Sequence, residues 1–438
     1  MADSGGYKYK LVCTGCSKEY SQDEKILVCR CGNKLEVKLN IESISLTLNE
    51  MKARRGRAAL NIHQRYFEFL PLLNYNQTVS IGEGGTSLLK ARRLGEKLGF
   101  SNLYIKNEIT NPTGSFKDRP IGVGVNKVLE HGFSTVATAS SGNAASSLAS
   151  YSAKCDLKCV AFVPSTAPAS KVSQLLMYGA KVVPLRRPPD FTGDPTVFML
   201  KKVYAEYGWI PVPSFGTLNP YQMEGAKTIG FEIAEELVPD HVVIPMGGAG
   251  LFIGNYNAFD QYKKVGITSS MPVLHAVQGA GCAPFVKAFV ENKPIETVKD
   301  PHTVAGGLAD PFTWDGKEAM PMLKKTGGYA VAVEDEPVLE AQKLLARYEG
   351  IFAEPTGSAS LAGLIKLAEE GRIPRQETVV IEVTGHGFKD LGIVEKRFSF
   401  PPVAEPELEN IKEVLKNFYS FNASEHITPL GYTPKFAV

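Results

Sequence analysis

Short apolar runs alternate with longer stretches of helical periodicity along most of this chain. The runs that we expect to form strands lie at 135–140, 157–165, 180–185, 241–248, 273–278, 329–333 and 378–385. The stretches with apolar residues at helical spacing lie at 143–154, 169–179, 252–264, 283–292, 336–350 and 358–371. Strands that are apolar throughout, each leading into a helix, are typical of a parallel sheet that helices cover on both faces. The pattern therefore predicts an α/β fold.

These strand–helix units are too many for one ordinary sheet, so we predict two doubly wound domains with a cleft between them. We assign residues 41–130 and 221–400 to a large domain and residues 131–220 to a small one. The sequence after residue 400 reads as a tail, 401–438, with one helix at 410–421.

The first forty residues stand apart, because short alternating runs there surround two pairs of cysteines. Cys13 and Cys16 form one pair, and Cys29 and Cys31 form the other. Two such knuckles can place four thiolates at the corners of a tetrahedron around zinc. The second pair encloses one residue instead of the usual two, so a small β-module without metal stays open as an alternative. We predict a zinc-ribbon-like module over residues 1–40, with zinc as a candidate structural metal.

Residues 41–80 connect this module to the regular alternation. We expect helix and connector there. The clearest feature is an amphipathic run at 63–73, in which aromatic and aliphatic residues recur.

Composition narrows the class of protein. The 438 residues include 48 basic and 46 acidic ones, a balance that argues against nucleic acid or an anionic membrane as a partner. No run is long and apolar enough to span a bilayer, and the N-terminus has no apolar signal core. An odd total of seven cysteines does not suit a secreted disulfide framework, and we expect Cys155, Cys159 and Cys282 to pack in the interior. We therefore expect a cytoplasmic protein.

Glycine-bearing turns follow three of the predicted strands, where α/β proteins bind their ligands. The turn at 140–147 leads into a helix whose N-terminus can hold an anion, and Asn143 stands ready to bind a ligand. The turn at 245–252 has small residues that let the backbone approach a phosphate, but it matches neither a Walker loop nor a dinucleotide fingerprint. Thr384 ends the last strand and faces the cleft. His386, between two glycines, reads as a turn residue or as a donor behind the site.

A fourth turn, "NPTGSFKDRP" at 111–120, contains Lys117. We place this lysine in the first turn of a helix, where the helix dipole disfavours a cation and lowers its pKa. Such a lysine suits Schiff-base chemistry. The alternative is an ordinary surface salt bridge with Asp118.

The four turns together supply the parts that a pyridoxal phosphate site needs. A lysine binds the cofactor covalently, glycines hold its phosphate, an asparagine meets the ring hydroxyl, and a neutral hydroxyl faces the ring nitrogen. The protein's task is then to hold and tune a cofactor that does the carbanion chemistry.

At this point the sequence resembles a known family. The motifs are "GEGGTSLL", "NPTGSFKDR", "ASSGNAASS", "TLNPYQMEGAKT" and "VTGHGFKD". In this order they are similar to those of threonine synthases, fold-type II pyridoxal phosphate enzymes of the tryptophan synthase β-like kind. The resemblance runs from about Tyr66 to about Arg397. "SGNAA" alone is shared with threonine dehydratases and cysteine synthases.

The resemblance implies a role for each matching residue. Lys117 would bind the cofactor and shuttle protons. The other residues implied to contact the cofactor are Phe116, Asn143, Gly247, Gly248, Ala249, Gly250, Leu251 and Thr384. Those implied to contact the substrate are Ser140, Ser141, Gly142, Ala144, Arg119, Asn219 and Gln222. The family reaction converts O-phosphohomoserine and water to L-threonine and phosphate by γ-elimination and β-addition of water, and we expect a homodimer.

Four positions depart from the family pattern. Gln222 stands where we expect an arginine, Ser87 where proline is usual, Pro120 where glycine is usual, and Ala249 lies in the phosphate loop. If the missing arginine binds the substrate phosphate, Arg119, Lys227 or Lys389 would have to replace it. The alternatives are therefore a relative that performs β-replacement, like a cysteate synthase, or β-elimination, like a threonine or serine dehydratase. A non-catalytic binding protein on the same fold is a further alternative from another class.

Overall fold

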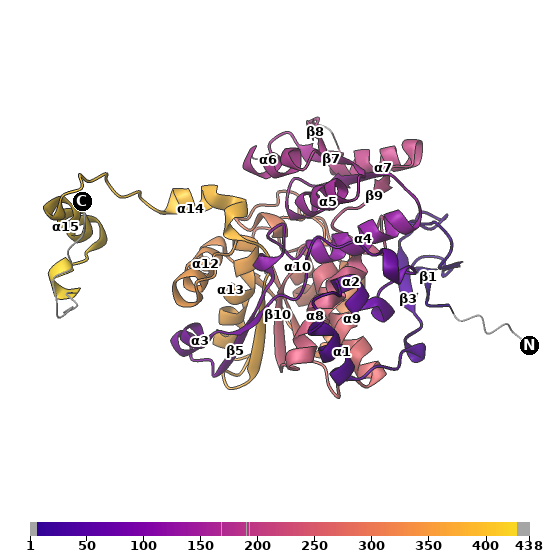
Figure 1. Cartoon of the computed structure of the whole chain (residues 1–438), viewed down its shortest axis with the longest axis horizontal. Coiled ribbons are helices and arrows are strands. Elements are labelled where there is room, and N and C mark those ends of the chain that lie inside the picture. The colour runs from indigo at the N-terminus through magenta and orange to yellow at the C-terminus, as the bar shows by residue number, and fades with distance from the viewer. Residues whose placement is uncertain (1–6, 168, 190, 192, 427–438) are drawn as a thin grey trace, which may run out of the picture. The chain divides into compact units, whose positions relative to one another are not determined.

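The computed structural model describes residues 7–167, 169–189, 191 and 193–426. The chain divides into two compact units, Met1–Asp390 and Leu391–Val438 (Figure 1). No helix among the described residues is long and apolar enough to cross a bilayer.

The largest sheet of the first unit has six strands. Their order is β12 (Ala330–Val333), β11 (Val273–Gly279), β10 (His241–Pro245), β13 (Thr378–Val383), β5 (Asn102–Asn107) and β4 (Leu88–Lys90). All neighbours are parallel except β4, which runs antiparallel to β5. β10, which opens the apolar run predicted at 241–248, is buried along its whole length, as expected for a central parallel strand.

Helices cover both faces of this sheet. Val242 and Ile244 of β10 pack into one core, and Val243 between them packs into another. The first core includes α8 (Lys227–Glu236), α9 (Gly250–Val265), α10 (Pro284–Glu291) and α11 (Gly316–Thr326). The second includes α3 (Arg92–Leu98), α12 (Asp335–Glu349) and α13 (Pro355–Glu369). The doubly wound arrangement follows from the two-residue period of a strand with apolar side chains throughout.

A second sheet has four parallel strands. Their order is β8 (Lys181–Leu185), β7 (Lys158–Pro164), β6 (Thr135–Ala139) and β9 (Ile210–Pro211). One face packs against α4 (Asp118–Glu130), α5 (Asn143–Lys154) and α6 (Ala169–Met177), and the other against α7 (Pro195–Tyr207). The predicted α/β class, with parallel sheets covered on both faces, is confirmed.

The N-terminal residues form a small antiparallel sheet with the order β2 (Glu19–Ser21), β1 (Tyr9–Cys13) and β3 (Leu35–Leu39). Tyr9 and Leu35 share a core with α4 and α5. The Tyr9 ring meets the Tyr221 ring edge-on at 6.1 Å. The module is therefore packed onto the α/β unit rather than tethered to it.

The amphipathic run at 63–73 is not one helix. α1 (Leu48–Arg55) precedes it, α2 (Ile62–Arg65) spans one turn, and a 3-10 turn follows at Phe67–Phe69. Leu70 is extended, with φ −114° and ψ 147°, because the residue before a proline is driven out of the helical region. In the second unit, α14 (Leu391–Arg397) and α15 (Leu408–Tyr419) are helical, and α15 starts two residues before the predicted helix.

A buried charge cluster joins α4 to the six-stranded sheet. Arg119 Nε donates to Glu108 Oε2 at 2.6 Å, and its Nη2 donates to Glu232 Oε2 at 2.8 Å. Lys106 Nζ of β5 donates to the same Glu232 oxygen at 2.6 Å. Burial opposes ionisation, but the Arg119 and Lys106 charges outweigh it and hold the pKa of Glu232 well below its ordinary value.

Replacing Arg119 by Met should leave two buried carboxylates without their guanidinium. We expect the free energy of unfolding to fall by about 3–5 kcal/mol, measured by denaturant unfolding. The control is Lys202→Met, which breaks an exposed pair with Glu206 and should cost less than about 1 kcal/mol. Equal losses in the two variants would contradict the role of the cluster.

Candidate active site

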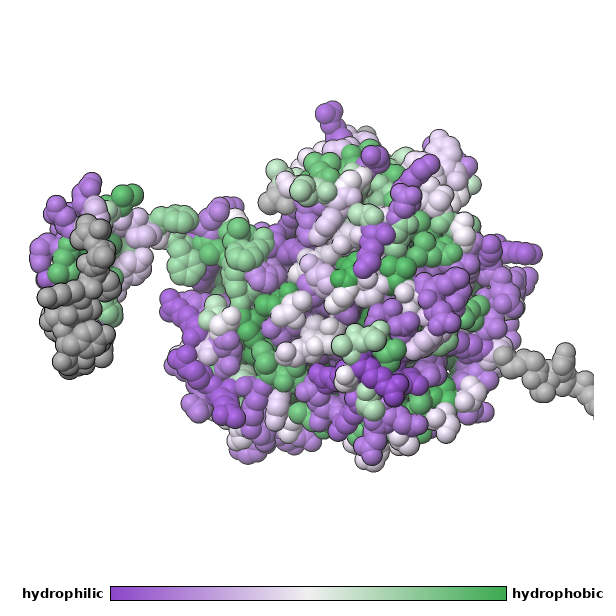
Figure 2. Space-filling model, viewed as in Figure 1, coloured by the Kyte–Doolittle hydropathy of each residue, from purple (hydrophilic) through white to green (hydrophobic). Residues whose placement is uncertain are grey.

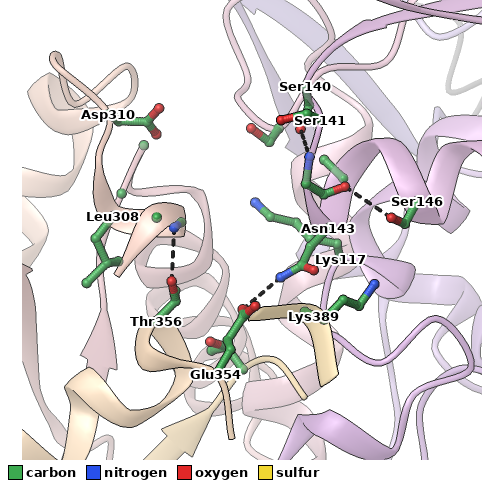
Figure 3. A pocket seen from close by; sticks show the side chains of 18 of the residues that line it. Lys117, Ser140, Ser141, Asn143, Ser146, Leu308, Asp310, Glu354, Thr356 and Lys389 are labelled. Atoms are coloured by element: carbon green, nitrogen blue, oxygen red, sulfur yellow. Dashed lines mark hydrogen bonds between the residues drawn. The ribbon is translucent and has the colours of Figure 1, made fainter. Parts of the chain in front are cut away.

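A cleft of about 380 Å³ lies at the carboxyl ends of strands from both α/β sheets. Ala139 ends β6, Pro245 ends β10 and Thr384 follows β13, and all three line the cleft. Figure 3 shows Leu308 and Asp310 on one side, with Ser140 and other residues of the 140–147 turn on the other. The glycine-bearing turns predicted from the sequence therefore do converge.

Lys117 precedes α4 directly and lines the cleft. The turn before it is fixed to the end of β13, because Phe116 N donates to Thr384 O at 2.9 Å. Burial lowers the pKa of Lys117 to about 8, and the negative charges of Asp310, Asp315 and Glu354 offset only part of this effect. The predicted direction of the shift holds, but its main cause is burial.

The alternative of a surface salt bridge between Lys117 and Asp118 is wrong. Asp118 is buried, and its carboxylate accepts from Thr113 N at 2.8 Å and from Thr113 Oγ1 at 2.6 Å. It therefore fixes the turn that carries Lys117 and leaves the amine free to face the cleft.

The 140–147 turn brings its polar groups to the opposite wall. Gly142 N donates to Ser140 Oγ at 3.2 Å, and α5 begins at Asn143. Asn143 Nδ2 donates across the cleft to Glu354 Oε1 at 2.8 Å (Figure 3). Burial raises the pKa of Glu354, although this hydrogen bond favours its charged form.

The 245–252 turn forms a tight loop before α9. A Cβ at Gly247 would lie 2.7 Å from Gly307 O, and one at Gly250 would collide with the Met223 side chain. Ala249 adopts the left-handed conformation with φ 74°. The first turn of a helix has N–H groups without intrahelical partners, so this loop can cradle a phosphate.

Thr384 also lines the cleft. Its side chain is buried, and within the described residues Thr384 Oγ1 has no hydrogen-bond partner. A buried hydroxyl left unpaired costs about 1–3 kcal/mol, so a ligand atom is expected to meet it. The glycine loop and this orphaned hydroxyl fit the phosphate and the ring nitrogen of pyridoxal phosphate.

Three predicted substrate residues do not line the cleft. Arg119 belongs to the buried charge cluster described above. Asn219 Nδ2 donates to Pro211 O at 3.0 Å, and Gln222 Nε2 donates to Phe215 O at 2.8 Å. Lys227, a suggested substitute for the expected arginine, is buried elsewhere and binds Phe69 O at 2.6 Å and Glu224. These residues were assigned to the substrate because they belong to the family motifs. In the structure they are packed behind the residues that line the cleft.

Two lysines do line the mouth of the cleft. Lys389 Nζ donates to Gln174 Oε1 at 2.9 Å, and Lys171 Nζ lies 3.4 Å from Asp390 Oδ2. Each pair links α6 with the turn after β13. Lys389 is one of the residues suggested from the sequence to replace the expected arginine. Sequence reasoning missed Lys171, although Lys171 and Gln174, three residues apart in a helix rich in apolar residues, could have indicated a polar side facing the cleft.

Asp310 and Glu354 were also missed. Asp310 lines the cleft, and burial raises its pKa to about 6 although Lys117 favours the charged form. Glu354 precedes Pro355 at the start of α13. A Glu-Pro step before a run of small residues is a helix-start signal that points to Glu354, whereas no local pattern singles out Asp310.

The four N-terminal cysteines gather at one end of the small module. Their sulfur atoms all lie within 4.8 Å of one another, with Cys13–Cys31 at 3.5 Å and Cys16–Cys29 at 3.6 Å. Four sulfurs bound tetrahedrally at about 2.3 Å from zinc are about 3.8 Å apart. Asn33 Nδ2 donates to Cys31 Sγ at 3.3 Å, the kind of outer contact that steadies a metal thiolate. These donors fit zinc.

Fold and cleft together define a pyridoxal phosphate enzyme of fold-type II. Residues 79–385 match the family described as "Pyridoxal-phosphate dependent enzyme". Maize serine racemase shares the fold with a TM-score of 0.61 and 22% identity, over 81% of this chain and 97% of that one. A threonine deaminase from Solanum lycopersicum gives a TM-score of 0.61 and 22% identity over 81% of this chain and 94% of that one.

The chain belongs to the threonine synthase family. It is 39% identical to a threonine synthase of Methanocaldococcus jannaschii over 92% of this chain and 98% of that protein. It is 40% identical to a threonine synthase of Methanosarcina acetivorans over 93% of this chain and 98% of that protein. A threonine synthase of a Bacillus species is 34% identical over 81% of this chain and 97% of that protein.

The lowered pKa of Lys117 has a measurable consequence. Only the neutral amine is a nucleophile, and with a pKa of about 8 roughly a quarter of it is neutral at pH 7.5. Cofactor uptake by cofactor-free protein, followed by visible absorbance, should therefore accelerate as pH rises, with a midpoint near the pKa of about 8, and level off about one pH unit above it. Lys117→Arg should take up no borohydride-fixable cofactor, and a midpoint near that of an exposed lysine, about pH 10.4, would contradict burial as the cause.

Proposed function

We propose that this chain converts O-phosphohomoserine and water to L-threonine and phosphate. The observation that carries the proposal is the presence of two anion sites in one cleft. The glycine loop before α9 suits the cofactor phosphate, and Lys171 and Lys389 at the mouth suit a second phosphate, that of the substrate. A dehydratase or racemase of this fold acts on unphosphorylated amino acids and has no need of the second site.

Each wall of the cleft has a task in holding the cofactor. Lys117 would bind it covalently, with Phe116 and Asn143 beside the ring. Gly247, Gly248, Ala249, Gly250 and Leu251 would hold its phosphate. Thr384 would meet the ring nitrogen, and a hydroxyl there leaves that nitrogen largely unprotonated. Pyridoxal phosphate, when bound, supplies the electron sink for a carbanion at the amino acid's α-carbon.

Lys117 is also the proton carrier of the proposed reaction. Its amine would take the proton from the α-carbon of the substrate and then one from the β-carbon, after which the γ-phosphate leaves. A proton would then be returned to the γ-carbon, water would add at the β-carbon, and the α-carbon would regain its proton. A lysine with a pKa of about 8 can both accept and return protons near neutral pH.

The substrate carboxylate is assigned to the turn before α5. Ser140, Ser141, Gly142 and Ala144 line the cleft there, and α5, which begins at Asn143, offers N–H groups without intrahelical partners in its first turn. Arg119, Asn219 and Gln222 would support the walls instead of touching substrate. The absence of an arginine at position 222 thus does not argue against a phosphorylated substrate, because that side chain does not line the cleft.

Lys171 and Lys389 are assigned to the substrate phosphate. They approach from α6 and from the turn after β13, and their present partners, Asp390 and Gln174, leave them able to rearrange. Burial lowers the pKa of Lys389, and the nearby Glu354 charge opposes this effect. A phosphate dianion would restore its charged form more strongly than the amide of Gln174 does.

We also propose that the four N-terminal thiolates hold one structural zinc and that the enzyme is a cytoplasmic homodimer. Within the described residues none of the seven cysteines forms a disulfide, which suits a reducing compartment. α15 leaves Leu408, Ile411 and Phe418 exposed on an amphipathic helix, and Figure 2 shows green hydrophobic atoms on this segment. A second copy of the chain is the proposed partner of that apolar side.

The activity test uses the purified holoenzyme. We expect O-phosphohomoserine to yield threonine and phosphate in equal amounts, and Lys117→Ala to lower kcat by at least about a thousandfold. Lys202→Met is the control for a lysine outside the cleft. Pyruvate or ketobutyrate from serine or threonine, with no threonine from O-phosphohomoserine, would move the assignment to the dehydratase alternative.

The phosphate assignment is tested by Lys171→Gln and Lys389→Gln. Each should lower kcat/KM for O-phosphohomoserine about tenfold to a hundredfold, the worth of one charged hydrogen bond. Inhibition by inorganic phosphate should weaken in parallel. Binding of unphosphorylated homoserine, followed by cofactor absorbance, should stay unchanged; an equal loss for both ligands would overturn the assignment.

A further inference from the structure

Lys34 occupies a position that both cysteine pairs determine. Its carbonyl oxygen accepts from Thr14 N at 3.0 Å and from Thr14 Oγ1 at 3.2 Å, and Thr14 lies inside the first pair. On the other side, Cys29 N donates to Asn33 O at 3.0 Å, next to Lys34. The backbone of Lys34 is therefore held by a residue from within the first cysteine pair and lies next to a residue bonded to the second pair.

The side chain of Lys34 leaves the module and reaches the α/β unit. Lys34 Nζ lies 2.5 Å from Asp315 Oδ1 and 3.6 Å from Glu318 Oε1. The Asp315 side chain is 1% exposed, and that of Lys34 is 16% exposed. A carboxylate this deeply buried needs its counter-charge, because removing one partner of such a pair leaves an uncompensated charge.

Asp315 in turn holds the loop assigned to the cofactor phosphate. Its backbone N donates to Gly248 O at 3.0 Å, and its Oδ2 accepts from Gly216 N at 2.9 Å. The preceding Trp314 stacks on Phe215 with ring centroids 4.5 Å apart. A Cβ on Gly248 would lie 3.5 Å from Trp314 Cδ1, so this indole reports on the same loop.

The segment Gly306–Asp315, which we call the clasp, contacts the glycine loop at two points. Gly307 O and Asp310 Oδ2 lie beside Gly247, and Asp315 binds Gly248. The clasp also brings two carboxylates close to a site for a phosphate. Without Lys34, the charge of Asp315 would repel that phosphate, so the lysine matters for electrostatics as well as for position.

We propose that Lys34 and Asp315 are positioning residues that couple the four-cysteine module to the cofactor-phosphate loop. Metal held by the thiolates fixes Lys34, Lys34 fixes Asp315, and Asp315 fixes Gly248. Loss of metal then weakens cofactor binding at a distance. The inference rests on the proposed function only in that the glycine loop holds the cofactor phosphate.

The experiment measures the Kd of pyridoxal phosphate on the full-length, cofactor-free chain. Trp209→Phe serves as the parent, because the only other tryptophan is Trp314 and its fluorescence then reports the clasp. Lys34→Met should raise the Kd about tenfold, the loss of one charge-assisted contact, and shift the Trp314 emission. Lys34→Arg should restore both. The matched control is Lys10→Met, which breaks an exposed pair with Glu19 on the same module and should change neither.

Metal dependence is read in the same titration. The parent should contain one zinc per chain, and chelation should raise its Kd by a factor similar to that of Lys34→Met. Chelation of Lys34→Met should add little, since both changes act through one link. The proposal would be overturned if chelation and Lys34→Met together raised the Kd by the product of their separate factors. A parent protein without zinc, or a Lys34→Met variant with an unchanged Kd, would also overturn it. Because neither readout needs turnover, a chain that binds cofactor but makes no threonine would refute the proposed activity alone.

Discussion

The buried cluster around Arg119 is the constraint on which the active cleft depends. α4 packs with its apolar side on the four-stranded sheet, yet the turn that precedes it must stay at the end of β13, in the other sheet. Arg119 reconciles the two demands by binding Glu108 and Glu232 of the six-stranded side. Lys117 stands two residues before this anchor. Its position in the cleft is thus set by ion pairs among residues that do not line the cleft, which is why a motif can contain both residues while only one lines the cavity.

Burial of ionisable groups, which costs free energy in the Arg119 cluster, also shifts the pKa values of groups that line the cleft. Lys117, Asp310 and Glu354 all have pKa values displaced toward their neutral forms, chiefly because water is removed from around them. Perturbed groups of this kind gather at functional sites, since a neutral amine and a protonated acid are the forms that exchange protons. The opposite charges of Lys117 and Asp310 offset part of the effect of burial on each of these two groups.

Much of the fold was readable from the sequence because buried parallel strands are written as unbroken apolar runs. The turns after those runs were equally readable, and Lys117, Asn143 and Thr384 lie together in the cleft. The residues that sequence reasoning assigned to substrate, Arg119 and Gln222, illustrate its limit. Whether a polar side chain lines a cavity or supports its wall is decided by packing between segments far apart in the chain.

Two further features needed the structure. The run at 63–73 has helical spacing, but α2 ends at Arg65, a 3-10 turn follows at Phe67–Phe69, and Pro71 drives Leu70 into an extended conformation. Asp310 has no pattern around it and acquires meaning only through its place beside Gly247. The domain limits and the roles of individual site residues stay predictions.

Ala249 adds conformational strain to the phosphate loop, which a loop made of glycines alone would not have. A residue with a Cβ in the left-handed region stores about 1–2 kcal/mol of conformational energy, and Ala249 does so at φ 74°. The backbone conformation of this loop is therefore maintained by the residues packed around it and not by the intrinsic preference of Ala249. The loop would be the first part of the cleft to relax if that packing loosened, so an enzyme of this design can lose its grip on the cofactor while the rest of the fold remains intact.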